Sequence, residues 1–232
     1  MEKLYDMLLQ DCRFTGSLTS CINCGTCTAI CPAAEFYDYD PRKIINIVQS
    51  KDETEIEKLL KSETIWYCGE CLSCTTRCPR NNSPGLVVMA LRSLSQRLGY
   101  FAESEKGRQQ FALNKMLGTN ILKYGYCVYP RTFHYDMFPE AGKVWKWQEK
   151  HLEDVYARLG ANLDGEGPGP LRKIPKEDLD DLKKIFDRTG ATAIMDKINK
   201  VSKEIADKEG LTEDEYFHKV FTETKKNHLN KK

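Results

Sequence analysis

The chain has 232 residues, of which 41% are hydrophobic and 30% are charged, and its formal net charge at pH 7 is +1. This mixture can bury a core, which excludes a wholly disordered chain, and the small net charge argues against nucleic acid as a partner because phosphate binding needs a concentrated basic face. No apolar stretch approaches the roughly 18–20 residues that a membrane span needs, and the sequence shows no export signal. We therefore expect a cytoplasmic protein without a membrane span, which meets a membrane only through its partners.

Eight of the ten cysteines form two rows of identical spacing. Row 1 contains Cys21, Cys24, Cys27 and Cys31, and row 2 contains Cys68, Cys71, Cys74 and Cys78. Each row follows the pattern C-x2-C-x2-C-x3-C and is followed directly by a proline, Pro32 or Pro79. This is the ligand pattern of [4Fe–4S] clusters in bacterial ferredoxins, so its two complete copies predict two [4Fe–4S] clusters.

The likeness to two-cluster ferredoxins also implies which thiolates bind together, because there the last cysteine of each row binds the cluster of the other row. A cubane has four iron corners, and three closely spaced cysteines can bind three of them from one tight loop. The implied ligand sets are Cys21, Cys24, Cys27 and Cys78 for one cluster, and Cys68, Cys71, Cys74 and Cys31 for the other. This exchange would hold the two clusters close together, as electron transfer between them requires.

Zinc binding and disulfide formation fit the cysteine spacing less well. Zinc sites usually take two pairs of ligands, and disulfides need an oxidising compartment. Gly25 and Gly69 lie inside the rows, where we expect the backbone to approach the sulfurs and to take positive φ. Cys12 and Cys127 lie outside the rows, and we expect both to be buried as small apolar side chains.

The residues around the rows predict helices rather than the short strands of an ordinary ferredoxin. Between the rows, Pro41 can open one helix, and Asp52 or Thr54 can cap a second. After row 2, Ser83 and Pro84 can begin a helix that is apolar on most of its circumference, and is therefore buried, and that ends at Gly99. Residues 103–117 predict another helix, with Phe111, Leu113 and Met116 on its apolar side.

The second half of the chain changes in character. Residues 124–147 contain eight aromatic residues interrupted by Pro and Gly, which fits either an irregular segment that fills gaps in the core or a docking surface. Residues 148–159 predict a helix, and residues 165–170 are rich in Gly and Pro, which is typical of a linker. Charged helices with narrow apolar stripes follow over residues 176–188, over residues 192–208 and from Thr212 onward.

The two rows and their helical surroundings resemble the α-helical ferredoxin domain, and the stretches CINCGTCTAICP (residues 21–32) and WYCGECLSCTTRCP (residues 66–79) resemble the C subunit of heterodisulfide reductase. The likeness covers about residues 1–115. The longer C-terminal half is similar to that of bacterial heterodisulfide-reductase-like subunits of sulfur oxidation. A plant-type [2Fe–2S] domain before the rows and CCG domains after them, which mark other members of this superfamily, are not found in the sequence.

The residue pattern and this resemblance together predict a mainly α fold in four segments. They are an α-helical ferredoxin domain (1–117), an aromatic-rich docking segment (118–160), a linker (161–175) and a charged helical extension (176–232). The resemblance implies a non-catalytic electron-transfer subunit of a hetero-oligomer, which relays electrons between an A-like flavoprotein and a B-like CCG-domain subunit. A free ferredoxin-like carrier, or the iron–sulfur subunit of another anaerobic dehydrogenase, is the alternative.

Overall fold

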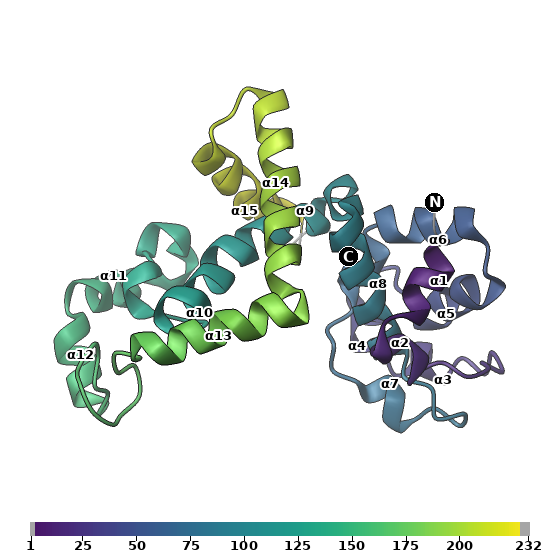
Figure 1. Cartoon of the computed structure of the whole chain (residues 1–232), viewed down its shortest axis with the longest axis horizontal. Coiled ribbons are helices and arrows are strands. Elements are labelled where there is room, and N and C mark those ends of the chain that lie inside the picture. The colour runs from purple at the N-terminus through teal and green to yellow at the C-terminus, as the bar shows by residue number, and fades with distance from the viewer. Residues whose placement is uncertain (1–2, 228–232) are drawn as a thin grey trace. The chain divides into compact units, whose positions relative to one another are not determined.

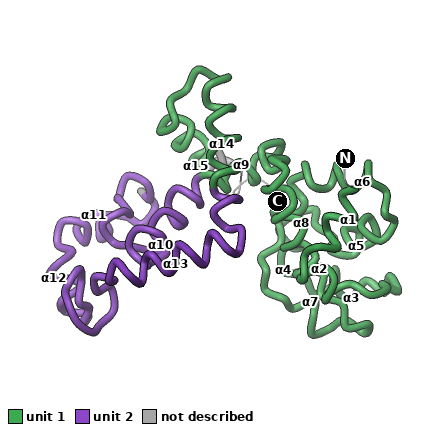
Figure 2. The backbone as a smooth tube through the Cα atoms, in the orientation of Figure 1, with its two compact units in different colours: residues 1–111, 196–232 green, residues 112–195 purple. Residues whose placement is uncertain are grey.

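The computed structural model describes residues 3–227, in which helices and turns are the only regular structure (Figure 1). The predicted mainly α fold is therefore confirmed. The chain forms two compact units, which Figure 2 colours separately: unit 1 comprises residues 1–111 and 196–232, and unit 2 comprises residues 112–195. The four segment boundaries expected from the sequence stay a prediction. Within residues 3–227, no helix combines the length and the apolar character that crossing a membrane takes.

Helix α8 (Pro84–Leu98) is the centre of unit 1. The helices packed against it include α1 (Leu4–Leu9), α2 (Cys12–Thr15), α5 (Pro41–Ser50) and α6 (Glu53–Lys61). Its side chains Val87, Val88, Leu91 and Leu94 are almost completely buried, as its nearly continuous apolar surface predicted. Burial of each such side chain stabilises the unit by about 1.5–3 kcal/mol, which makes α8 a firm support for the loops around it.

The helices near the rows begin at Pro41 and after Asp52, as the sequence predicted, and Asp40 is a cap that the sequence analysis did not identify. Asp40 accepts hydrogen bonds from the backbone N–H groups of Arg42 and Lys43 at the start of α5, where Pro41 is the first helical residue. Asp52 caps α6 in the same way, and Gly99, with φ 86°, ends α8. Ser83 precedes α8 but caps it with no side-chain hydrogen bond, because its hydroxyl pairs with the hydroxyl of Thr75 instead.

The helix predicted over residues 103–117 is shorter and less regular than expected. Helix α9 (Glu105–Leu113) follows the turn η2 (Tyr100–Glu103), and a π-helical turn η3 (Asn114–Gly118) then leads into α10 (Thr119–Tyr124). Phe111 is fully buried, but Leu113 is 47% exposed, so its expected place on the apolar side is wrong. Phe111 and Leu113 are two residues apart in α9, so they lie on nearly opposite sides of the helix and cannot both face the core.

Two long helices near the C-terminus add to unit 1. They are the part of α14 (Ala191–Glu209) from Asp196 onward and α15 (Glu213–Asn227). The rings of Phe111 and Tyr216 are 5.7 Å apart, and Ile198 and Val220 are buried with them. Thr212 and Glu215 form a reciprocal capping box at the start of α15, in which each residue's backbone N–H donates to the other's side chain.

Unit 2 contains α10 and the aromatic segment, followed by α11 (Gly142–Lys150), α12 (Leu152–Arg158) and α13 (Lys176–Thr189). Short 3-10 turns, η4 (Pro130–Thr132), η5 (Tyr135–Met137) and η6 (Pro139–Ala141), make the first part irregular, as expected. The helix predicted over residues 148–159 instead begins at Gly142 and is interrupted at His151. Residues 162–173 form a loop closed by backbone hydrogen bonds, including one from Asn162 N–H to the Pro170 carbonyl.

Candidate metal centre

The two cysteine rows repeat the same backbone conformation. Asn23 in row 1 and Glu70 in row 2, which occupy equivalent positions, both have positive φ, at 60° and 54°. The next pair of equivalent residues, Gly25 and Leu72, also have positive φ, at 80° and 58°. The expected positive φ is therefore found at Gly25 but not at Gly69, where the prediction was wrong. In row 2 it falls on Leu72, a residue for which this conformation is sterically costly.

The polar contacts to the sulfurs repeat as well. The backbone N–H of Asn23 donates to Cys21 Sγ at 3.3 Å, and that of Glu70 donates to Cys68 Sγ at 3.4 Å. Thr26 Oγ1 lies 3.4 Å from Cys24 Sγ, and this hydroxyl lowers the pKa of the Cys24 thiol. Hydrogen bonds to a sulfur favour its anionic form, which is the form that binds iron.

The third cysteine of each row lies in the first turn of a short helix, α3 (Thr26–Ala29) or α7 (Ser73–Thr76), and these two helices pack together. Burial raises the pKa of both thiols, Cys27 and Cys74. Ionising such a thiol is unfavourable unless a positive charge lies nearby. A cationic iron centre supplies that charge and so stabilises the thiolate.

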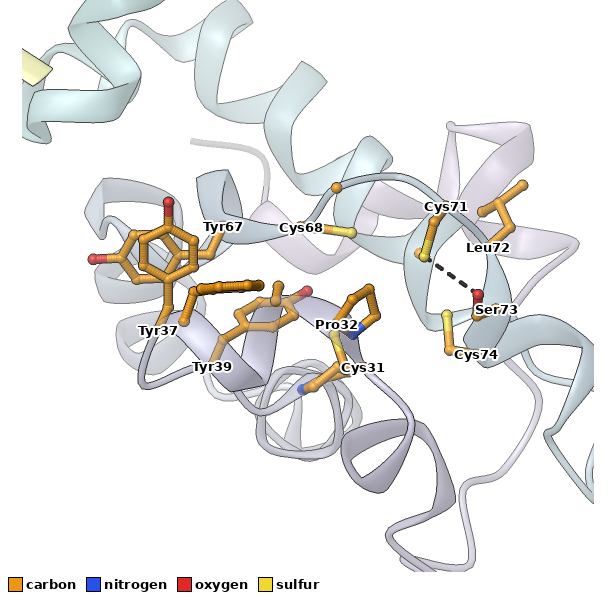
Figure 3. Close-up of a pocket in the computed structure, with 15 residues that line it drawn as sticks. Cys31, Pro32, Tyr37, Tyr39, Tyr67, Cys68, Cys71, Leu72, Ser73 and Cys74 are labelled. Atoms are coloured by element: carbon orange, nitrogen blue, oxygen red, sulfur yellow. Dashed lines mark hydrogen bonds between the residues drawn. The ribbon is translucent and has the colours of Figure 1, made fainter. Parts of the chain in front are cut away.

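A cavity of about 270 Å³ lies beside row 2 (Figure 3). Its wall contains the first three cysteines of row 2 and the last cysteine of row 1, namely Cys68, Cys71, Cys74 and Cys31. The rest of the wall is largely apolar and aromatic, and includes Tyr37, Tyr39 and Tyr67. Four thiols around one largely apolar cavity are the donor set that a [4Fe–4S] cluster takes, so the residues present fit this group.

Hydrogen bonds join the flanks of the two rows. Asn82, four residues after Cys78, accepts from the backbone N–H of Thr19 at 2.8 Å and from its hydroxyl at 3.0 Å. Ser83 N–H donates to the carbonyl of Ser17 at 2.8 Å. These contacts join the segment that precedes Cys21 to the segment that follows Cys78. Because Asn82 is only 2% exposed, the contacts are shielded from competition with water.

Arg92 on α8 holds the loop of row 2 in place. Its guanidinium donates to the carbonyl of Ile65 at 2.7 Å and to the carbonyl of Cys68 at 2.6 Å, and it also pairs with the carboxylate of Glu70. Its side chain is only 16% exposed and packs over the ring of Trp66. No local pattern in the sequence indicates this role, since the partners lie 22 to 27 residues away along the chain.

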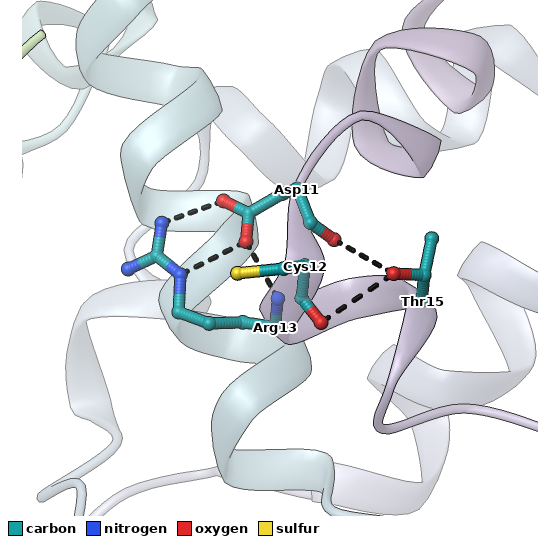
Figure 4. Close-up of polar contacts among 4 residues, drawn as sticks. All are labelled: Asp11, Cys12, Arg13 and Thr15. Carbon is teal, nitrogen blue, oxygen red and sulfur yellow. Dashed lines mark hydrogen bonds and ion pairs between the residues drawn. The ribbon is translucent and has the colours of Figure 1, made fainter. Parts of the chain in front are cut away.

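The two remaining cysteines differ from the prediction. Cys12 and Cys127 are both exposed, so their expected burial is wrong. Cys12 is the first residue of the four-residue helix α2, next to Asp11, whose carboxylate binds the side chain of Arg13 and caps the helix (Figure 4). Phe14 is the buried residue of this short helix, whereas the side chain of Cys12 is exposed to solvent.

Among residues 3–227, no three His, Cys, Asp or Glu side chains converge as the ligands of a single metal ion would. A cubane binds each thiolate at a different iron corner, so its ligands surround a volume instead of meeting at one point.

Comparison with known proteins places these features in a family. Residues 17–82, which contain both rows, match the 4Fe-4S dicluster domain. The chain is 33% identical over 167 residues to the C2 subunit of the H(2)/formate:CoB-CoM heterodisulfide,ferredoxin reductase of Methanococcus maripaludis, covering 72% of each protein. It is 37% identical over 150 residues to the C subunit of the ferredoxin:CoB-CoM heterodisulfide reductase of Methanosarcina acetivorans, covering 62% of this chain but only 54% of the relative. A third relative, from Archaeoglobus profundus, is named as similar to the C subunit of heterodisulfide reductase; it is 39% identical over 80 residues, which are 33% of this chain and 40% of the relative.

The matching relatives are named as the same kind of subunit, and the matched domain is defined by two clusters. The predicted relationship and the predicted pair of clusters are both confirmed. The chain belongs to the family of heterodisulfide reductase C subunits and is an iron–sulfur electron-transfer protein that carries two [4Fe–4S] clusters.

Proposed function

We propose that the chain is the electron relay of a heterodisulfide-reductase-like complex. One partner is a flavin- and iron–sulfur-containing protein similar to the A subunit of heterodisulfide reductase. The other is a CCG-domain protein similar to the B subunit, in which the disulfide chemistry takes place. The relatives support this proposal because their names describe them as subunits of heterodisulfide reductases. None of the ten cysteines, all of which lie within residues 3–227, forms a disulfide, which suits the reducing cytoplasm, where we place the complex.

The cavity beside row 2 is the observation that carries the proposal. It supports one ligand set of Cys68, Cys71, Cys74 and Cys31, in which the last cysteine comes from the other row. The second set consists of Cys21, Cys24, Cys27 and Cys78, and the hydrogen bonds of Asn82 to Thr19 support it by joining the flanks of the two rows. Crossed ligands hold the two clusters on adjoining loops, which a relay requires.

Each bound cluster would supply a one-electron relay site, and the surrounding residues orient the thiolates and limit the access of water. The N–H groups of Asn23 and Glu70 stabilise negative charge on the first sulfur of each row. Ala33 and Tyr39, both buried, form part of the largely apolar wall of the cavity. None of these residues acts on a substrate in our proposal, so the chain itself is not catalytic.

Exposed apolar side chains next to the ligands favour a permanently bound protein over a diffusing carrier. Ile22, between the first two cysteines of row 1, is 59% exposed, and Phe36, at the end of α4 (Pro32–Phe36) and in the wall of the cavity, is 61% exposed. Apolar side chains at such positions allow a partner to approach closely in a dry contact. The small net charge agrees, since carriers that meet their partners transiently are usually steered by a strong charge.

The aromatic segment is proposed as a second docking surface. Some of its rings pack within unit 2. The rings of Tyr124 and Tyr129 are stacked with their centroids 4.0 Å apart, and Tyr129 is buried. On α11, by contrast, Val144 is 74% exposed and Trp147 is 50% exposed. The packed first part agrees with the first of the two roles considered from the sequence, and the exposed side chains of α11 support the proposed docking role. Whether the partners are of the methanogen type or the sulfur-oxidising type stays a prediction.

Anaerobic purification of the tagged full chain from its own cells, with mass spectrometry and flavin and iron analysis, tests the proposal. We expect a flavoprotein and a CCG-domain protein to copurify. A Val144→Asp variant should recover less of at least one partner at unchanged iron content, whereas Ile185→Asp, an equally drastic change at an exposed site of α13, should not. A lone iron-containing chain would instead establish a free carrier.

A further inference from the structure

One residue in each cysteine loop holds the first sulfur of its row and is itself held by a side chain from a helix. In row 1 this residue is Asn23, whose backbone N–H donates to Cys21 Sγ and whose side-chain oxygen accepts from the amide of Asn46 on α5 at 3.2 Å. In row 2 it is Glu70, whose backbone N–H donates to Cys68 Sγ. The two loops are built alike, so the side chains that hold them can be compared directly.

The side chain that holds the loop of row 2 carries a full positive charge. Arg92 on α8 pairs with the carboxylate of Glu70 and also donates to the carbonyl of Cys68 at 2.6 Å, so it binds the backbone of a cysteine of the row directly. Asn46, its counterpart at row 1, is neutral. A guanidinium stays protonated in proteins, so the charge of Arg92 is present at any physiological pH.

Water screens the charge of Arg92 only weakly. Its side chain is 16% exposed, whereas that of its partner Glu70 is 40% exposed, so the carboxylate is the better solvated member of the pair and compensates the guanidinium only in part. Arg42, whose guanidinium lies beside Gly25 of row 1, is 37% exposed and pairs with Asp40. The two rows therefore differ in that a shielded cation is bound to the loop of row 2.

We propose that Arg92 is a positioning residue that raises the reduction potential of the cluster bound by the first three cysteines of row 2 (the row 2 cluster), relative to a chain without its charge. Reduction adds one electron from the donor, and therefore one negative charge, to a cluster and its sulfurs, and a shielded cation nearby stabilises that charge. The ion pair also keeps Glu70 where its N–H reaches the sulfur of Cys68. The inference rests on the row 2 cysteines of the proposed function but not on which row supplies the fourth ligand.

The test is a redox titration of the anaerobically reconstituted full chain with dithionite, followed by electron paramagnetic resonance. The signals altered in Cys71→Ser and in Cys24→Ser identify the row 2 cluster and the other cluster. In Arg92→Gln, which keeps a polar donor but removes the charge, the row 2 cluster should become harder to reduce by about tenfold in its equilibrium constant, the size of one hydrogen bond to a charged group. A tenfold change corresponds to a shift of about 59 mV to more negative potential for one electron. The other cluster should keep its potential.

Two further variants separate the effect of the charge from a merely structural effect. Arg92→Lys keeps the charge but loses the forked donor group, so it should retain more than half of the difference in potential between the wild type and Arg92→Gln. Glu70→Gln removes the negative member of the pair but keeps the size of the side chain and the backbone N–H, so it should shift the same potential in the opposite direction. Arg42→Gln is the matched control and should leave the potential of the row 2 cluster unchanged.

An unchanged potential of the row 2 cluster in Arg92→Gln, at full iron content, would overturn the inference. Shifts of the same sign in Arg92→Gln and Glu70→Gln would also overturn it, because a loosened loop would then explain both. If Arg92→Gln does not retain its clusters, Glu70→Gln decides alone, and a potential at or below that of the wild type contradicts the inference. The relay function is decided separately, by the copurification of partners from wild-type cells.

Discussion

Arg92 should be the residue outside the cysteines on which the row 2 loop depends most. Replacing it by Met keeps the length of the side chain and its packing on Trp66 but removes every donor. The carbonyls of Ile65 and Cys68 then lose their charged partner. An unsatisfied buried carbonyl costs about 1–3 kcal/mol, so two would cost about 2–6 kcal/mol together. Because these two are only partly buried, we expect a value near the low end of that range, about 2–3 kcal/mol. The lost ion pair with Glu70, whose carboxylate is half exposed, adds little.

For a domain of this size, a loss of about 2–3 kcal/mol in the free energy of unfolding lowers the melting temperature by roughly 4–12 °C. The assay is an anaerobic thermal scan of the cluster-loaded chain at one fixed scan rate, because cluster loss makes unfolding irreversible. The row 2 cluster should be lost first, as seen by electron paramagnetic resonance during the scan. Arg158→Met is the control, since Arg158 is 75% exposed and its pair with Asp154 lies on the surface of α12. If both variants melted together with the wild type, Arg92 would not hold the loop and the reasoning would be wrong.

Two further outcomes follow from the same structure. The variants Cys12→Ser and Cys127→Ser should each keep the iron of two clusters, because both thiols are exposed and lie outside the rows. Colorimetric iron analysis checks this prediction. Loss of iron from either variant would show that a ligand has been missed. Removing the clusters with a chelator should loosen residues 17–82, because the row cysteines then lose the iron that joins the two loops, so limited proteolysis should cut there first. A cleavage pattern unchanged by the loss of iron would show that the loops fold without metal.

The parts of this protein that could be predicted from its sequence are those encoded over short distances. The cysteine spacing predicts the two clusters, and Pro41, Asp52 and Gly99 predict helix ends, because ligand, cap and turn preferences act within a few residues. The sequence analysis missed the π-helical turn η3 between α9 and α10, because no proline near it signals an interruption of the helix. The positive φ of Leu72 was missed for a similar reason, since leucine carries no signal for it.

The residues that complete the site could not be predicted, because their partners are distant in the sequence. Asn82 contacts Thr19 across 63 residues, and Arg92 contacts Cys68 across 24. Such long-range contacts are set by the packing of α8 and the row loops, for which no local pattern exists.

The exchange of ligands between the rows is the central claim, and the spectra of single cysteine variants test it most directly. Electron paramagnetic resonance of the reduced chain should show that Cys31→Ser and Cys71→Ser perturb the same cluster, although Cys31 belongs to row 1, and that Cys24→Ser perturbs the other. The cavity that contains both Cys31 and Cys71 predicts this result. If Cys31→Ser instead perturbed the same cluster as Cys24→Ser, each row would bind its own cluster and the account of a crossed two-cluster relay would be contradicted.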